Sequence, residues 1–424
     1  METLVIRGGR TVSGRVRVSP AKNAVLPIIA ASLLARTPSR LEEVPALADV
    51  QTICAVIRHL GAQVREQDGG LVIEPPGELN WEAPEELVRR MRASFLVLGP
   101  LLVRTGRARI SVPGGCAIGT RPIDLHLKGI SLLGATITQR KGYIEAFAPR
   151  LRGNRIYLDF PSVGATENIM CAAALAAGQT VIENAAEEPE VVDLANFLNA
   201  MGAQIKGAGT RVVRIQGVGE LYGATYSVIP DRIEAGTFLL TAPMAGGQVV
   251  VENVIADHLK PVVAKLKEAG VSVQEEENSI RVASDGQYRA VDLKTLPYPG
   301  FPTDMQPQFM ALLTRARGTA VITETVFENR FMHAAELRRM GAHITVVGRT
   351  AIVHGTKGLT GTRVCATDLR AGAALALAAL SADGETLITG LEHIDRGYAG
   401  FVEKLQGLGV DVARRGAGEE PGRP

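Results

Sequence analysis

A short signature for the end of a helix recurs six times along the chain at nearly constant spacing. In each copy a glycine follows an amphipathic stretch and precedes an alternating strand pattern, which is typical of a helix that ends on a residue with positive φ. The glycines are Gly61, Gly134, Gly202, Gly270, Gly341 and Gly409, at intervals of 73, 68, 68, 71 and 68 residues. Such a regular interval indicates six copies of one structural unit.

Each copy also contains a second helix and further short strands. A turn glycine precedes a closing strand in five copies, at Gly106, Gly178, Gly247, Gly318 and Gly384. The segment after it is rich in β-branched and apolar residues, as in Thr180, Val181 and Ile182. The pattern therefore predicts a mixed α/β (α+β) fold built from modules of two helices and several short strands.

The sixth copy is incomplete, and the N-terminus carries segments that match what it lacks. The copy ends at residues 410–412 and a polar tail, without the two closing strands of the other copies. The stretches 4–9 and 13–18 match the closing strands of the third copy at 213–217 and 222–228. We therefore predict that two N-terminal strands complete the sixth copy, and that the chain forms two domains of three copies each.

The first predicted domain spans residues 20–229 and carries a mobile loop at 112–122, and the second combines 1–19 with 230–413. Residues 414–424, which are polar and rich in glycine and proline, are predicted to form a disordered tail. The cleft between the two domains is the expected active site.

Composition and charge exclude several classes of function. The 424 residues carry 46 basic and 44 acidic side chains, a formal net charge of +2, so nothing global favours nucleic acid or a membrane surface as partner. The chain has no apolar run of about 18 residues and no N-terminal signal pattern. Its four cysteines form no CxxC pair. These features predict a cytoplasmic protein without membrane insertion.

Sequence motifs for cofactors and metals are missing as well. The chain has no GxxxxGK[ST] phosphate loop and no GxGxxG dinucleotide turn. No cluster of His, Cys, Asp and Glu has the spacing of metal ligands. We therefore expect no cofactor and no metal, and small-molecule substrates as partners.

The loop at residues 113–122 has the composition of a reactive site. Two glycines permit a tight and mobile loop, Cys116 supplies a titratable thiol, and Arg121 could hold an anion beside that thiol. Cys116 is therefore the candidate reactive cysteine. The other three cysteines lie in apolar helix or strand patterns and are predicted to pack in the core: Cys54, Cys171 and Cys365.

Basic residues stand at predicted helix starts. Helices are expected to begin near Lys22, Arg92 and Arg370, and Arg330 and Arg396 open the following helices in the same way. A helix N-terminus already favours anions, so a cation there is unfavourable for stability and suggests that it binds a ligand anion. The alternative is that these are exposed charges that only add solubility.

Asp304 lies at another predicted helix start, and two interpretations are open. It could cap its helix, which is the commoner use of an aspartate there. It could instead be a general base near the anion-binding cations. His126 and His393 are likewise open between a structural and a functional role.

Eight segments carry specific motifs: 19–24, 91–94, 113–126, 162–166, 187–190, 301–306, 323–330 and 394–398. Together they resemble the enolpyruvyl transferase family over essentially the whole chain up to the tail. The family fold is two inside-out α/β barrels of three repeats each, with the active site in the cleft between them. That architecture agrees with the interval of the glycines.

The resemblance implies a reaction. The 3-hydroxyl of UDP-N-acetylglucosamine attacks C2 of phosphoenolpyruvate while a proton is added at C3, and the resulting tetrahedral ketal loses phosphate. This is the first committed step of peptidoglycan precursor synthesis. The related transfer to shikimate 3-phosphate shares the fold but lacks the cysteine loop, so it is the less favoured alternative. A non-enzymatic ring or clamp is a further alternative, which the balanced charge disfavours.

The resemblance also implies residue roles. Cys116 would donate the C3 proton and could trap phosphoenolpyruvate covalently, and Asp304 would be the base, with Lys22 and Arg396 assisting catalysis. Phosphoenolpyruvate would be held by Lys22, Asn23, Arg121, Arg330, Arg370 and Arg396. UDP-N-acetylglucosamine would be contacted by Arg92, Arg121, Pro122, Ile123, Asp124, Leu125, Ser162, Val163, Gly164, Asp304 and Val326. Phe95 and Phe160 replace a tryptophan and a lysine that occur in some relatives.

Overall fold

The described residues form two units that each contain three sheets of three or four strands, and the second unit also holds one two-stranded sheet. The computed structural model describes residues 2–113, 118–119, 122–140 and 142–416. The first unit holds the described residues of 20–115 and 121–229, and the second holds those of 1–19, 116–120 and 230–424. The second unit is therefore assembled from three separate stretches of the sequence.

The sheets of the first unit share one strand order. An edge strand runs parallel to its neighbour, which pairs antiparallel with a third strand, and the third pairs antiparallel with the last. In one sheet the parallel edge is only a bridge between Glu82 and Arg109. In sheet order the strands are β13 (Thr225–Tyr226), β3 (Ser39–Leu41), β5 (Gly70–Glu74) and β4 (Gln63–Gln67); β6 (Arg107–Ser111), β8 (Tyr143–Phe147) and β7 (Thr136–Arg140); and β9 (Arg155–Tyr157), β10 (Gln179–Glu183), β12 (Val212–Gln216) and β11 (Gln204–Lys206).

The second unit repeats this order three times. Its strands are β2 (Val12–Arg17), β14 (Gly247–Glu252), β16 (Ser279–Ser284) and β15 (Ser272–Glu275); β17 (Leu293–Lys294), β18 (Thr319–Thr323), β20 (Thr350–His354) and β19 (His343–Val347); and β22 (Arg363–Cys365), β24 (Glu385–Thr389), β1 (Thr3–Arg7) and β25 (Asp411–Arg415). A short parallel pair adds β21 (Leu359–Thr360) and β23 (Ala382–Asp383).

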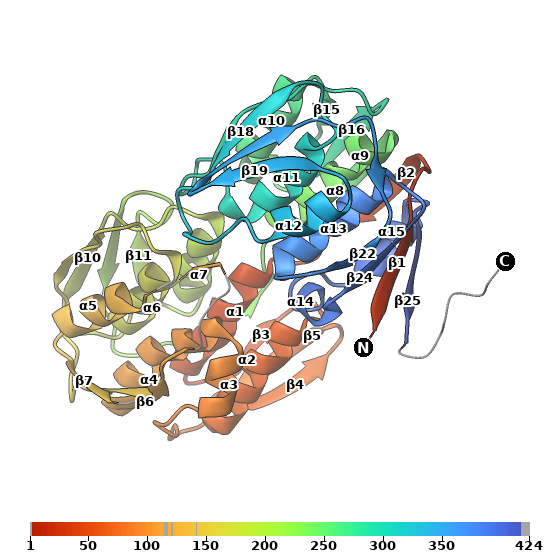
Figure 1. Cartoon of the computed structure of the whole chain (residues 1–424). Coiled ribbons are helices and arrows are strands. Elements are labelled where there is room, and N and C mark those ends of the chain that lie inside the picture. The colour runs from red at the N-terminus through yellow and green to blue at the C-terminus, as the bar shows by residue number, and fades with distance from the viewer. Residues whose placement is uncertain (1, 114–117, 120–121, 141, 417–424) are drawn as a thin grey trace. The chain divides into compact units, whose positions relative to one another are not determined.

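The N-terminal strands complete two different sheets. β1 lies between β24 and β25, with Leu4 opposite Ile388 on one side and Arg414 on the other (Figure 1). β1 thus completes the sixth copy, as predicted. β2 does not: it pairs in parallel with β14, in the sheet of the fourth copy. The first sheet of the other unit takes its parallel edge from β13 in the same manner, so each unit supplies its own edge strand.

The C-terminal tail begins later than predicted. Arg414 and Arg415 belong to β25 and pair with Leu4 and Thr3, because β1 offers them the hydrogen-bonding groups of its second edge. The second domain was predicted to end at residue 413 and the tail to begin at residue 414, and both bounds were therefore wrong. Residues 417–424 lie outside the described part of the chain.

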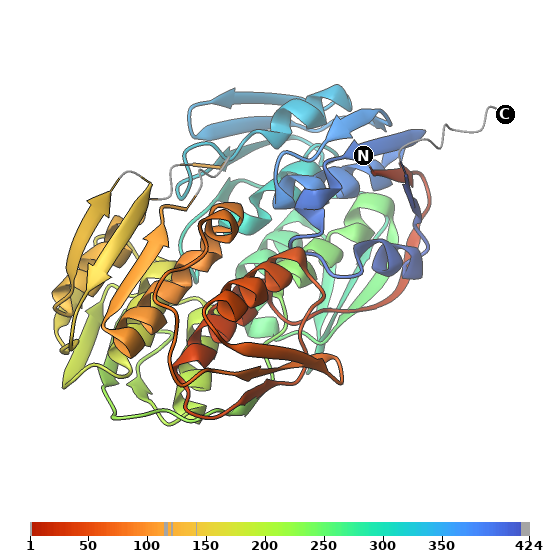
Figure 2. The ribbon, with the colours of Figure 1, turned by 90° about the horizontal axis from the view of Figure 1, so that it is seen from below.

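The helices lie inside and the sheets outside. Strands such as β10 and β20 alternate between buried and more accessible residues, whereas helices such as α13 are buried on every face. Figure 2 shows the helices of each unit running between its strands. The first unit contains α1 (Lys22–Ala31), η1 (Ser32–Leu34), α2 (Ala48–His59), α3 (Glu85–Arg90), η2 (Arg92–Val97), α4 (Leu98–Thr105), α5 (Asp124–Leu132), α6 (Val163–Ala173) and α7 (Pro189–Ala200).

The second unit contains a corresponding set. It comprises α8 (Arg232–Leu239), α9 (Thr241–Ala245), η3 (Ala256–Leu259), α10 (Lys260–Ala269), η4 (Thr303–Met305), α11 (Gln306–Leu313), α12 (His333–Arg339), α13 (Leu369–Leu380), α14 (Leu391–Ile394) and α15 (Phe401–Gly407). Over the described ranges, none of these helices has the length and apolar character needed to cross a bilayer. The predicted α/β class, with helices enclosed by sheets, is confirmed.

The six repeated glycines adopt the backbone conformation that the pattern predicts. Their φ angles are 105°, 102°, 107°, 92°, 95° and 84° in chain order. A side chain at such an angle is strained, so glycine is the residue that lets each helix turn directly into the next strand.

Candidate functional site

The helix starts predicted near Lys22, Arg92 and Arg370 are confirmed, whereas those at Arg330 and Arg396 were wrong, because α12 begins only at His333 and α15 only at Phe401. α1 begins at Lys22, η2 at Arg92 and α13 next to Arg370. The remaining inner segments begin at Val163, Arg232 and Thr303. Asp368 caps α13, because its Oδ1 accepts hydrogen bonds from the backbone N–H groups of Arg370 and Ala371.

In the second unit the structure brings Asp304, Arg330 and Arg370 together. Arg330 Nη2 donates to Asp304 Oδ1 at 2.8 Å, and Arg370 Nε and Nη2 donate to Asp304 Oδ2 at 3.1 and 3.0 Å. The side chains of Arg330 and Arg370 are 4% and 3% exposed, whereas that of Asp304 is 27% exposed. Two buried guanidinium groups therefore converge on one half-buried carboxylate.

The two arginines dominate the electrostatics of that carboxylate. Burial alone would raise the pKa of Asp304, but the charges and hydrogen bonds of Arg370 and Arg330 outweigh burial and hold its pKa well below the ordinary value. Burial lowers the pKa of Arg370, but the charge of Asp304 reverses this and raises it. Asp304 and Arg370 are therefore both ionised at neutral pH.

Of the two interpretations of Asp304, the helix cap is wrong. η4 begins at Thr303 without a side-chain cap, and the Asp304 carboxylate is directed to the arginines instead. Charge explains the preference, since hydrogen bonds between ionised partners are stronger than those to a backbone N–H group.

The guanidinium groups retain further donors. Arg330 Nε and Arg370 Nη1 are buried and have no hydrogen-bond partner among the residues that the structure describes. Arg370 also lies over the ring of Tyr398 at 5.5 Å, and the Tyr398 hydroxyl is 2.9 Å from the hydroxyl of Thr237. Sequence analysis missed Tyr398, although it follows Arg396 in the motif at 394–398.

Glu324 is a second carboxylate beside this cluster that sequence analysis missed. It directly follows β18, is 1% exposed, and accepts hydrogen bonds from the hydroxyls of Thr295 and Thr303, both at 2.9 Å. It also accepts from the backbone N–H groups of Val326 and Phe327 at 2.8 and 3.1 Å. Val326 is thereby tied to the Asp304 segment. The available signal was a glutamate between two threonines at the end of a strand.

In the first unit Lys22 pairs with an acid. Its Nζ lies 3.1 Å from Asp49 Oδ2, and the two side chains are 12% and 5% exposed. The pair joins the start of α1 to the first turn of α2. Asn23 follows on α1 and is half-buried.

Arg92 contacts the segment that leads into α5. Its Nη2 donates to the carbonyl oxygen of Pro122 at 3.1 Å. Ile123 is the residue before α5, and Asp124 and Leu125 form its first turn. Four of the predicted nucleotide-sugar contacts therefore lie on one segment that Arg92 holds.

The start of α6 lies against α5. Ser162 caps α6 by accepting from the N–H of Ala165 at 3.4 Å, and Val163 and Gly164 begin the helix. A Cβ at Gly164 would lie 3.1 Å from His126 Cε1 on α5, so glycine permits this close approach. The predicted residues on the two helix starts are thus neighbours.

His126 has a structural environment. It is buried, its Nδ1 lies 3.2 Å from Asn168 Nδ2, and its ring meets Phe95 edge-on with centroids 5.2 Å apart. Asn168 also donates to the carbonyl of Phe95 and accepts from the N–H of Gly99. Phe95 is therefore part of the packing behind the helix start, whereas Phe160 is 43% exposed.

Two predicted residues, Cys116 and Arg121, lie outside the described residues. Ile118, within the same loop, belongs to the second unit, and its carbonyl accepts a hydrogen bond from Asn329 N at 3.1 Å. Arg396 lies in that unit as well, two residues after α14.

Of the other cysteines, Cys54 and Cys171 are buried as predicted. Burial raises the pKa of Cys54 to about 11 and that of Cys171 still further. The prediction for Cys365 was wrong: it is exposed on β22, because alternate residues of that edge strand face outward.

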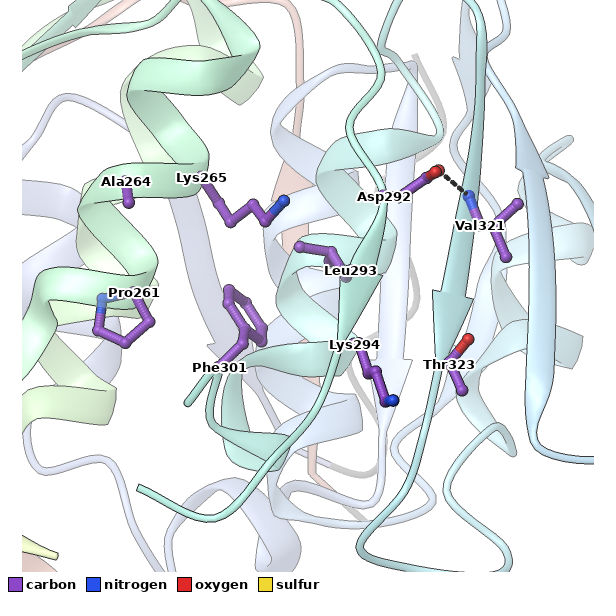
Figure 3. Close-up of a pocket in the computed structure, with 9 residues that line it drawn as sticks. All are labelled: Pro261, Ala264, Lys265, Asp292, Leu293, Lys294, Phe301, Val321 and Thr323. Carbon is purple, nitrogen blue, oxygen red and sulfur yellow. Dashed lines mark hydrogen bonds between the residues drawn. The ribbon is translucent and has the colours of Figure 1, made fainter. Parts of the chain in front are cut away.

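A cavity of about 490 Å³ lies elsewhere in the second unit, beside β17 and β18 (Figure 3). Its lining contains Lys265, Lys294, Phe301 and Thr323 but none of the predicted site residues. Among the described residues, no group of His, Cys, Asp and Glu has the arrangement needed to hold a metal ion.

A chain with two units of three α/β copies, and with paired arginines around an acidic residue, has the architecture of a carboxyvinyl-transferring enzyme. The family model for EPSP synthase (3-phosphoshikimate 1-carboxyvinyltransferase) matches residues 6–405. The chain belongs to this enolpyruvyl transferase family.

Named relatives match nearly the full length. The UDP-N-acetylglucosamine 1-carboxyvinyltransferase 2 of Carboxydothermus hydrogenoformans is 62% identical over 98% of this chain and 99% of its own. The UDP-N-acetylglucosamine 1-carboxyvinyltransferase 1 of Halalkalibacterium halodurans is 59% identical over 98% of this chain and 94% of its own.

Solved structures agree on the fold. The enolpyruvyl transferase NikO from Streptomyces tendae has a TM-score of 0.89 at 28% identity, covering 97% of this chain and 98% of its own. EPSP synthase from Acinetobacter baumannii has a TM-score of 0.77 at 20% identity, covering 98% of this chain and 100% of its own, and shows the fold alone.

Proposed function

We propose that this protein transfers the enolpyruvyl group of phosphoenolpyruvate to the 3-hydroxyl of UDP-N-acetylglucosamine and releases phosphate. The observation that carries the proposal is the identity of 59–62% over nearly the whole chain with relatives named for this activity. The reaction is the first committed step of peptidoglycan precursor synthesis. Its substrates are small and soluble, and we place it in the cytoplasm.

The reaction proceeds by addition and elimination. The sugar O3 forms a bond to C2 of phosphoenolpyruvate and loses its proton, while C3 gains a proton and becomes a methyl group. Loss of a C3 proton and of phosphate from the ketal then restores the double bond. A donor and a base are needed for the addition, and we assign these roles to Cys116 and Asp304.

The cations fit a substrate that carries a carboxylate and a phosphate. We assign Arg330 and Arg370 to the carboxylate, since they are buried, fork-shaped donors that already hold one. Lys22, Arg121 and Arg396 are assigned to the phosphate, and Asn23 to the reacting centre. The neighbouring starts of α5 and α6, together with Arg92, Asp304 and Val326, are assigned to the nucleotide sugar.

The geometry of Asp304 adds a step to this scheme. While its carboxylate accepts hydrogen bonds from both arginines, its pKa is held well below the ordinary value and it is a weak base. A substrate carboxylate that takes over the two arginines removes that stabilisation. Asp304 then becomes more basic and is free to accept the proton of the sugar hydroxyl.

The test is phosphate release with candidate acceptors side by side. The protein is incubated with phosphoenolpyruvate and either UDP-N-acetylglucosamine or shikimate 3-phosphate. We expect phosphate only with the nucleotide sugar. Release with shikimate 3-phosphate alone would reassign the acceptor, and no release with either would refute the transfer reaction.

A further inference from the structure

Glu324 is a buried carboxylate for which the proposed reaction gives no role. It accepts four hydrogen bonds, two from threonine hydroxyls and two from backbone N–H groups. Over the described ranges, Glu324 forms no salt bridge with a cation. A buried carboxylate without a paired cation is costly to maintain, so a neutral residue would be expected unless the carboxylate were needed.

A carboxylate differs from the isosteric amide at one position only. Glu324 Oε1 accepts from Thr295, Val326 and Phe327, and a glutamine oxygen could accept the same bonds. Oε2 accepts from the hydroxyl of Thr303. A glutamine would place an N–H donor there, so the requirement for a carboxylate concerns Thr303.

An acceptor at that position fixes the direction of a hydrogen-bond chain. The Thr303 hydroxyl has one proton, which it donates to Glu324 Oε2 at 2.9 Å. Its lone pairs therefore remain for Arg330 Nη1, which lies 3.4 Å away. The same guanidinium donates to Asp304 through Nη2 at 2.8 Å. Glu324 thus acts on the orientation of Arg330 through Thr303.

The pairing of β17 with β18 explains why Glu324 contacts both the segment that follows β17 and the segment that follows β18. β17 and β18 run parallel, with Lys294 opposite Thr323, and Figure 3 shows these two residues side by side. Asp292 Oδ1 accepts from Val321 N at 2.7 Å and fixes this pairing (Figure 3). Glu324 is the first residue after β18, where the chain leaves the sheet.

We propose that Glu324 is a positioning residue for the transfer reaction. It orients Arg330 for the phosphoenolpyruvate carboxylate through the Thr303 hydroxyl, and it holds the backbone at Val326 for the nucleotide sugar. The inference rests on the proposed function, because the roles of Arg330 and Val326 come from it. The effect through Arg330 concerns phosphoenolpyruvate and the effect through Val326 concerns the nucleotide sugar, so the two effects can be measured separately.

The first variant is Glu324→Gln. It keeps the Oε1 acceptor for the Val326 and Phe327 N–H groups and reverses only the contact with Thr303. We expect the KM for phosphoenolpyruvate to rise about tenfold, the effect of roughly one hydrogen bond to a charged group. The KM for UDP-N-acetylglucosamine should stay within about twofold of the wild type.

Thr303 tests whether the effect passes through the hydroxyl. Thr303→Val removes the hydroxyl at constant shape and should raise the same KM, whereas Thr303→Ser keeps the hydroxyl and should restore it. In the double variant that combines Glu324→Gln with Thr303→Val, the KM for phosphoenolpyruvate should be no higher than in Thr303→Val alone. Such non-additivity is expected of two residues in one chain of contacts.

Glu336→Gln is the matched control. Glu336 also accepts a backbone N–H bond in the second unit, from Cys365 at 2.9 Å, and it pairs with Arg339, and neither partner is an assigned site residue. Both KM values should be unchanged in this variant. Thermal unfolding of every variant shows whether a change in KM merely follows lost stability.

Three outcomes would overturn the inference: a wild-type KM for phosphoenolpyruvate in Glu324→Gln, additive effects in the double variant, or both KM values rising in proportion to destabilisation. An inactive wild-type protein would instead refute the proposed function itself. The two failures are therefore distinguishable within one experiment.

Discussion

At the scale of single residues, the distinctive feature is that Asp304 holds the arginines assigned to the substrate. Its carboxylate and that of phosphoenolpyruvate are chemically alike, so they compete for Arg330 and Arg370. The protein thus contains an internal competitor. Binding of the substrate must displace it, and the free energy of that displacement weakens the measured affinity.

Neutralising Asp304 should therefore strengthen substrate binding while abolishing turnover. We expect Asp304→Asn, in a Cys116→Ser background that removes the covalent trap, to bind phosphoenolpyruvate about tenfold more tightly, because an amide competes poorly for two guanidinium groups. Isothermal titration calorimetry without nucleotide sugar measures this. Phosphate release with Cys116 intact should be lost.

The control for Asp304→Asn is Asp231→Asn. Asp231 is 5% exposed, its charge acts on Arg370, and its Oδ1 caps α8 by accepting from Ile233 and Glu234 N–H groups. Asparagine can keep those caps. If Asp231→Asn tightens binding as much as Asp304→Asn, the gain comes from net charge, and the competition model is incorrect.

At the scale of elements, a buried acid joins α7 to β13. Asp193 on α7 accepts from the Tyr226 hydroxyl at 2.7 Å and from Ile229 N at 3.3 Å. Burial, only partly offset by these hydrogen bonds, raises the pKa of Asp193 to about 6. The folded state therefore holds this proton more tightly than the unfolded chain, whose aspartates have a pKa of about 3.9.

The sign of the pH dependence follows from that difference. The stability that the proton contributes is fully present below about pH 4 and is lost as the pH rises through about 6. We expect Asp193→Asn, which is neutral throughout, to lose less thermal stability than the wild type between pH 5 and pH 8. Parallel melting temperatures in the two proteins would show that Asp193 does not titrate in this range.

The glycines that end the helices should be costly to replace. Gly134 has a φ of 102° and open space where a Cβ would lie, so Gly134→Ala introduces only backbone strain. We expect a loss of about 1–2 kcal/mol in the free energy of unfolding. Chemical denaturation measures it, and Gly77→Ala is the control, because Gly77 has open space without positive φ. Equal stability of both variants would contradict the strain argument.

The local sequence pattern predicted where helices end and begin, because interactions between neighbouring residues determine these positions. The helix-ending glycines and the helix starts at Lys22, Arg92 and Thr303 follow from neighbouring residues in the sequence. The partner of β2 does not, since alternation defines the faces of a strand but not the strand beside it. The direct ion pairs of Arg330 and Arg370 with Asp304 were likewise not predicted, because Asp304 lies far from both arginines in the chain.

The residue types in the site were only partly predictable. Cations at helix starts contradict the usual preference and could be recognised for that reason. No local sequence preference distinguishes Glu324, which is simply a polar residue after a strand. Its role depends on its hydrogen-bond partners Thr295, Thr303 and the backbone of Val326, which the fold brings to it. A buried carboxylate can be identified only once its surroundings are known.

At the scale of the whole molecule, both ends of the chain complete one sheet. β25 covers the second edge of β1 over five residue pairs, from Thr3 and Arg415 to Arg7 and Asp411. We expect a chain that ends at residue 410 to melt about 10 °C lower, as for a loss of roughly 3–4 kcal/mol. A chain that ends at residue 416 keeps every pair and should melt with the full chain. Differential scanning calorimetry compares the three, and equal melting of both truncations would show that β25 contributes little.

The position of β1 between β24 and β25 also sets an order of assembly during synthesis. β1 is synthesised before β24 and β25, so the sheet that contains all three strands cannot close until β25 has left the ribosome. The first unit uses residues 20–115 and 121–229, all synthesised before residue 230, and can fold while the rest is still being made. The nascent strand β1 must meanwhile stay unpaired and soluble, although Leu4, Val5 and Ile6 are all apolar and are buried in the finished sheet.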